Sequence, residues 1–134
     1  MKAVLLAAAL TTLLFSCQKT TEEPQDFSGK YKITQLVFQS KGNPDQDLLS
    51  TFPDCAQDNL LVFGANSSFT TEDAGVSCGE EATEPTAWSA KGNKMTIDGV
   101  QSNIVSFDSH TLVLSTPMEF MDIPGTVLET LEKQ

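Results

Sequence analysis

Residues 86–115 read TAWSAKGNKMTIDGVQSNIVSFDSHTLVLS, and this stretch decides the fold. It holds four short runs of aliphatic, β-branched and aromatic residues between turn residues, at 86–90, 95–98, 103–107 and 111–115. Asp98-Gly99, between the second and third runs, is a strong signal for a two-residue hairpin turn. Short strands at this regular spacing predict an antiparallel barrel or sandwich rather than a protein of alternating strands and helices.

The rest of the chain extends this pattern in both directions. Further strands are predicted at 30–40, 60–63 and 68–72. The first of them changes from alternation to a continuous apolar run at Leu36, which indicates a strand that bends or bulges. Residues 126–133 fit a helix by the spacing of their apolar side chains. They fit a last strand equally well, and a closed barrel requires one.

The start of the chain predicts export and lipid anchoring. Residues 1–16 combine a positive start, an uncharged apolar run over 3–15 and a small residue before the cleavage point, as in a secretory signal peptide. The sequence LFSC at 14–17 resembles the bacterial lipobox, which implies acyl chains on Cys17. Two or more such chains anchor a protein stably. We expect a protein anchored to the outer membrane of the cell envelope, facing the periplasm or the cell surface; the alternative is an ordinary signal peptide.

Three segments are therefore expected. They are the signal peptide 1–16, a lipidated flexible tether 17–26 and one domain 27–134. The tether is polar and acidic, so it cannot bury a core of its own. The domain is long enough to build a single core without a metal.

Cys55 and Cys78 are the only cysteines after Cys17. Export would place them in an oxidising compartment, where an even pair is expected to form a disulfide. A metal site is the alternative, but no Cys-x-x-Cys spacing and no nearby histidine supports it. We therefore predict the disulfide.

The chain is strongly acidic. It has 18 Asp and Glu residues against 8 basic residues, a net charge of −10, and every basic residue is a lysine. Nucleic-acid binding needs a basic surface, so that class of function is excluded. Without arginine, the chain also lacks a bidentate clamp for phosphate or carboxylate. We find no Gly-rich phosphate loop and expect no cofactor.

The chain resembles the bacterial lipocalin-like lipoproteins over residues 27–133. The features that carry the resemblance are, in order, GKY at 29–31, DC at 54–55, DNLLVF at 58–63, Cys78, WS at 88–89, GNKMTI at 92–97 and TLVL at 111–114. Lipocalins typically carry Gly-x-Trp at the start of the first strand, where this chain has Tyr31. The resemblance implies an all-β fold, a small antiparallel up-and-down barrel of about eight strands. It also implies a disulfide between the two loop cysteines and no catalytic residues.

Two groups of polar residues could suggest catalytic or metal sites. His110, the only histidine, lies in the turn 108–110, where adjacent residues cannot converge as the members of a catalytic triad do. Acidic residues gather at 45–47, 54–58 and 80–84, without the spacing of a calcium-binding loop. We interpret the histidine as an exposed turn residue and the acidic groups as solvated loops, and we expect neither an enzyme nor a metal protein.

Five residues are candidates to line a ligand site: Tyr31, Trp88, Met118, Phe120 and Met121. Tyr31 and Trp88 fit core positions as well. The stretch 118–121 fits an adaptable binding lip, a core or a covered edge. We predict a domain that binds a small apolar ligand. The alternative is a structural or protein-interaction module of an outer-membrane complex, and the size of the barrel interior distinguishes the two.

Overall fold

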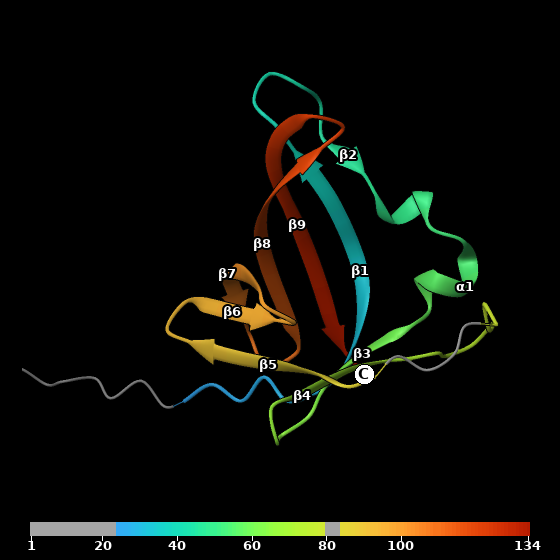
Figure 1. Ribbon diagram of the computed structural model, residues 1–134, viewed down its shortest axis with the longest axis vertical. Helices are drawn as coiled ribbons and strands as arrows, with labels where there is room; N and C mark the ends of the chain where they lie inside the picture. The colour runs from blue at the N-terminus through green and yellow to red at the C-terminus, as the bar shows by residue number, and fades with distance from the viewer. Residues whose placement is uncertain (1–23, 80–83) are drawn as a thin grey trace, which may run out of the picture.

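The computed structural model describes residues 24–79 and 84–134 (Figure 1). Nine strands provide nearly all of the regular structure in these ranges. They are β1 (Gly29–Gln39), β2 (Gln46–Asp47), β3 (Leu60–Phe63), β4 (Ser68–Glu72), β5 (Thr86–Lys91), β6 (Lys94–Ile97), β7 (Val100–Phe107), β8 (Thr111–Phe120) and β9 (Ile123–Lys133). The helices of the described ranges are the 3-10 turn η1 (Leu49–Thr51) and the single turn α1 (Asp54–Gln57). The prediction of an all-β protein is confirmed.

Eight of these strands close into an antiparallel barrel. Each strand from β3 to β8 pairs with the next, and β1 pairs with β3 on one side and with β9 on the other. The short β2 pairs with Val37 and Phe38, further along β1 than the part that pairs with β3. Closure joins the two edges of the sheet, so the main strands all have neighbours. The predicted up-and-down barrel of about eight strands is confirmed.

The strand register settles two points that the sequence left open. β1 shifts its register against β9 between Ile33 and Gln35, so the predicted bend is a β-bulge. The last segment of the chain is the strand β9, which pairs with β8 from Ile123 to Glu132. The closing strand is therefore the correct alternative, and the helix is excluded.

Two-residue turns connect several neighbouring strands. Asp98 and Gly99 have φ values of 48° and 80°, the left-handed conformation of the predicted hairpin turn. Met121 and Asp122 form a second such turn between β8 and β9, with φ values of 51° and 61°. This turn contains no glycine, so the usual sequence signal for it is missing.

Large apolar side chains form a core inside the barrel. The buried core consists of Phe27, Tyr31, Phe63, Met95, Leu112, Leu114 and Leu131. Phe63 contacts the rings of Tyr31 and Trp88, each with a centroid distance of 5.5 Å and a nearly perpendicular orientation. Because side chains alternate along a strand, these buried residues identify the inner face of each strand.

The barrel has two ends, named here by residues that lie at them. At the Phe27 end, where β1 begins and β9 ends, the ring of Phe27 is buried 4.6 Å from that of Phe107. At the Met121 end, where β8 turns into β9, the long strands β1, β8 and β9 run together (Figure 1). There Phe38 is buried 5.5 Å from the ring of Phe120 and packs on Gly125, where a Cβ would come within 2.5 Å of the Phe38 ring.

Cys55 and Cys78 form the predicted disulfide, with their Cα atoms 5.2 Å apart. The bond links α1 to the loop that follows β4. Asp58 holds the same loop, because its Oδ2 accepts a hydrogen bond from the backbone N–H of Val76 at 2.8 Å. Gly75 has a φ of +70° and leaves room for this carboxylate, since a Cβ there would clash with Oδ2. The loop is therefore fixed at two neighbouring points.

Within residues 24–79 and 84–134, we find no helix with the length and apolar character needed to cross a bilayer. The predicted signal peptide, Cys17 and most of the predicted tether lie outside the described residues, as do residues 80–83 of one acidic group.

Candidate functional site

A pocket of about 760 Å³ opens at the Phe27 end of the barrel. Its walls come from the segment that precedes β1, from the hairpin between β5 and β6, and from the second half of β7. The lining includes the apolar side chains of Phe27, Ala90, Ile104 and Phe107 and the amide side chains of Gln25 and Asn93. Pockets that hold small molecules typically measure about 300–1,000 Å³.

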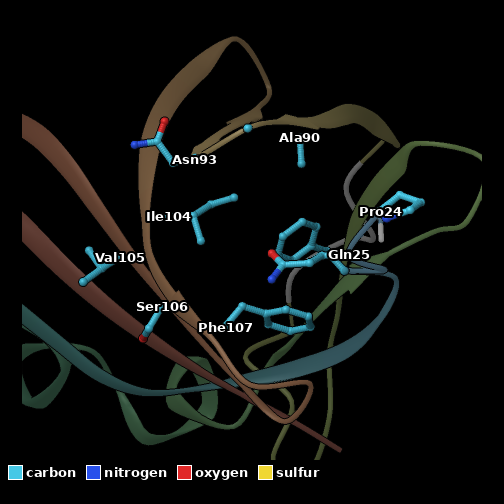
Figure 2. A pocket seen from close by; sticks show the side chains of 10 residues that line it. Pro24, Gln25, Ala90, Asn93, Ile104, Val105, Ser106 and Phe107 are labelled. Carbon is cyan, nitrogen blue, oxygen red and sulfur yellow. The ribbon is translucent and has the colours of Figure 1, made fainter. Parts of the chain in front are cut away.

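Apolar side chains from two strands face the centre of this pocket. Ile104 and Phe107 of β7 and Ala90 of β5 point into it, and residues 24–25 face them from the opposite side (Figure 2). Val105 points away from the centre (Figure 2). The register shift that β7 makes against β8 just after Ile104 lets Ile104 and Phe107, three residues apart, face the same side. The pocket is therefore lined by apolar side chains of β5 and β7 together with the amide side chains of Gln25 and Asn93.

The segment before β1 is held in place as a wall. The Asp26 carboxylate accepts a hydrogen bond from the backbone N–H of Ser28 at 2.9 Å. Hydrogen bonds from Ser28 hold the pKa of Asp26 below its usual range. The next residue, Phe27, is only 4% exposed and anchors the segment in the core. Phe27 thus anchors this wall to the barrel, and the Asp26–Ser28 hydrogen bond fixes the turn that leads into β1.

Comparison with known proteins agrees with this architecture. The model of the lipocalin-like domain matches residues 27–114, which is more than half of the chain. The chain belongs to the lipocalin-like domain family. No curated protein and no solved structure matches it. The lipocalin-like barrel is a ligand-binding type of domain, and lipocalins are in general non-catalytic binding proteins.

Tyr31 lies in the core of the lipocalin-like domain, and Trp88 is partly buried against that core. Tyr31 is fully buried, and its hydroxyl has no hydrogen-bond partner among the described residues. Burial raises the pKa of Tyr31, with a smaller contribution from the Asp26 carboxylate. The indole Nε1 of Trp88 donates a hydrogen bond to the carbonyl oxygen of Gly64 at 2.9 Å. Trp88 lies two residues before Ala90 on the same face of β5, which places it about 7 Å along the strand from the pocket wall.

The other predicted lining residues lie at the Met121 end. Met118 and Phe120 follow Leu114 on the inner face of β8, because its register with β9 is unbroken. Met121 is in the hairpin turn and is 80% exposed. The structure therefore brings Met118 and Phe120 to one face but separates them from the two core aromatic residues. None of the five lines the pocket at the Phe27 end.

Glu129 is an inner-face residue that the sequence patterns did not reveal. It pairs with Leu114 on β8 and Leu36 on β1, and it lies between Val127 and Leu131 on the inner face of β9. Its side chain is partly buried, and desolvation raises the pKa of its carboxyl to about 7. Among the described residues, no hydrogen bond and no neighbouring charge contributes to this shift. Alternation along a strand at 127–131 is the signal that would have placed it inside.

The remaining polar candidates have a structural explanation. His110 is exposed in its turn, as interpreted from the sequence. The Asp108 carboxylate accepts hydrogen bonds from the backbone N–H groups of Thr111 at 2.7 Å and His110 at 3.0 Å, and these bonds lower the pKa of Asp108. Over the described ranges, no three His, Cys, Asp or Glu side chains are grouped as metal ligands would be.

Proposed function

We propose that this chain is a lipid-anchored lipoprotein of the bacterial cell envelope whose barrel binds a small apolar molecule without catalysing a reaction. The observation that supports ligand binding is the pocket at the Phe27 end. Its volume of about 760 Å³ suits one small molecule, and Phe27, Ile104 and Phe107 supply apolar contacts.

The pocket wall offers both apolar and polar contacts to a small, mainly apolar ligand. Removing apolar surface from water favours binding by about 25 cal/mol per Å², before the entropic cost of association is subtracted. Gln25 and Asn93 offer amide groups in the pocket wall, which can hydrogen-bond a polar group of the ligand. No charged side chain contributes to the described pocket wall, so charge recognition is not expected there.

Ligand binding is tested with N-phenyl-1-naphthylamine, a neutral apolar probe that fluoresces more strongly in an apolar site. The full chain is expected to bind this probe and to transfer excitation to it from Trp88, the only tryptophan. Ala90→Phe places a ring in the pocket and is expected to weaken binding about tenfold, which corresponds to about 1.4 kcal/mol. A fluorescence titration gives both affinities.

The matched control is Val100→Phe. Val100 is 57% exposed and adjoins the turn between β6 and β7, away from the pocket walls. This variant is expected to bind the probe as the wild type does. Equal binding by Ala90→Phe and the wild type, or no binding by either, would contradict the proposal and favour a protein-interaction module instead.

Anchoring through Cys17 is a separate part of the proposal and has its own test. Mass spectrometry of the mature N-terminus is expected to find an acylated Cys17. Cys17→Ala is expected to move the protein from the membrane fraction to the soluble fraction, because it removes the sulfur that carries the diacylglycerol. An unmodified mature protein that begins at another residue would overturn this part of the proposal.

A further inference from the structure

The inner face of β1, β8 and β9 continues past the closed part of the barrel. The pairing of β8 with β7 reaches Ser115, and that of β1 with β3 reaches Lys32. Beyond these residues the three long strands continue to pair with one another toward the turn at 121–122. Glu129 pairs with the residue before Ser115, so it lies at the level where the barrel wall becomes incomplete.

An apolar surface extends from Glu129 toward the Met121 end. Met118 and Phe120 on β8 occupy successive inner-face positions, and Val127 on β9 faces inward as a buried residue. Met118 is 42% exposed although it is on the inner face. Glu129 also keeps partial access to solvent. These two exposures indicate that solvent reaches the inner face of the barrel at this end.

Two hydroxyl groups lie one inner-face position beyond the carboxylate, toward the Met121 end. Ser102 and Thr116 hydrogen-bond to each other at 2.6 Å, and Ser102 is buried. Thr116 pairs with Val127, so it is the diagonal neighbour of Glu129 on the inner face, at about 7 Å between their Cα atoms. A carboxylate and a hydroxyl pair thus form one polar layer between the core and the apolar surface.

The carboxylate of Glu129 is not neutralised within the described part of the protein. Desolvation alone perturbs its ionisation, and desolvation penalises the charged form. Lys133, at an inner-face position of the same strand, lies over the ring of Tyr31 at 5.8 Å. A partly enclosed carboxyl on the same inner face as the exposed Met118 is suited to a ligand that brings its own positive charge.

We propose that the Met121 end binds a primary alkylammonium ligand. Its ammonium group donates hydrogen bonds to Glu129, and its alkyl chain extends past Thr116 toward Met118 and Phe120. An ammonium group offers three donors, and its hydrogen bonds to a carboxylate are stronger than those between neutral groups. This site is at the opposite end of the barrel from the pocket at Phe27, so it does not depend on the proposed function.

The test compares n-octylammonium with 1-octanol, which has the same chain and no charge, by isothermal titration calorimetry on the full chain at pH 8. Glu129→Gln keeps the shape of the side chain and removes its charge. It is expected to weaken octylammonium binding about tenfold or more, because the charged hydrogen bond is lost. Octanol binding is expected to change less than about twofold, since a neutral head does not use the carboxylate charge.

Two control variants show whether Glu129 itself holds the ammonium group. Glu132→Gln removes a charge from the exposed outer face of the same strand, and it is expected to leave octylammonium binding unchanged. Ala90→Phe blocks the pocket at the Phe27 end and is also expected to have no effect. Equal weakening by Glu129→Gln and Glu132→Gln would show general attraction to an acidic surface and overturn the proposal. Loss of binding in Ala90→Phe but not in Glu129→Gln would overturn it as well.

Discussion

Replacement of Glu129 by glutamine is expected to stabilise the protein by up to about 3 kcal/mol at pH 8 and to change its stability little at pH 4. Folding raises the pKa of this carboxyl from 4.5 to about 7. Each pKa unit corresponds to about 1.4 kcal/mol of difference between the two protonation states. Partial solvent access of the side chain makes the full value an upper figure.

The direction follows from the sign of the shift. Below pH 4.5 the carboxyl is protonated in both the folded and the unfolded chain, so it does not lower the free energy of unfolding. Between pH 4.5 and about 7 the unfolded chain releases the proton while the folded chain keeps it, and the free energy of unfolding falls. Above about pH 7 the carboxyl is charged in both states, and the free energy of unfolding has fallen by the full amount. Glutamine does not titrate, so the variant escapes this loss.

Urea unfolding at pH 4, 6 and 8 measures the effect in the wild type, in Glu129→Gln and in Glu132→Gln. Glu132 is exposed on the outer face of the same strand, and its replacement is expected to change stability by less than about 0.5 kcal/mol at each pH. A Glu129→Gln variant no more stable at pH 8 than Glu132→Gln would show that the carboxyl is solvated.

Removal of the Cys55–Cys78 disulfide is expected to lower the free energy of unfolding by about 3.4 kcal/mol. The two cysteines are 23 positions apart, and the chain-entropy model gives this value for a closed segment of that length. The bond links α1 to the loop after β4, so its loss also frees the loop that Asp58 holds. The variant is Cys55→Ala together with Cys78→Ala.

Denaturant unfolding of the double variant, with the wild type under oxidising and reducing conditions, provides the measurement. The reduced wild type is expected to match the double variant, because both lack the cross-link. A difference below about 0.5 kcal/mol between the oxidised wild type and the double variant would contradict the expected role of the bond.

Most of the strands were predictable because their signals are local. Runs of alternating or continuous apolar residues lie between turn residues such as Asp98 and Gly99, and the register confirms that turn. β8 runs past the predicted end at Ser115 and through Pro117, a residue type that usually interrupts a strand. Pro117 is tolerated there because β8 pairs with β9 but no longer with β7 at that position, so the missing N–H is less costly.

The pocket at the Phe27 end and the inner-face position of Glu129 were harder to predict, because both depend on residues far apart in the chain. The pocket combines residues 24–27 with β5 and β7, and no local pattern shows that these segments meet. Glu129 was missed because the apolar residues of 126–133 fitted both a helix and a strand. Only pairing with β1 and β8 shows that Glu129 shares a face with Val127 and Leu131.

The most direct test of ligand binding is to locate the bound probe by NMR. Isotope-labelled protein is titrated with N-phenyl-1-naphthylamine, and the backbone amide shifts are followed. The expected result is saturable shifts centred on Ala90, Ile104 and Phe107, which face the pocket from β5 and β7. No saturable shift, or shifts confined to residues outside the pocket walls, would contradict the proposal that the Phe27 end of the lipocalin-like barrel holds a small apolar ligand.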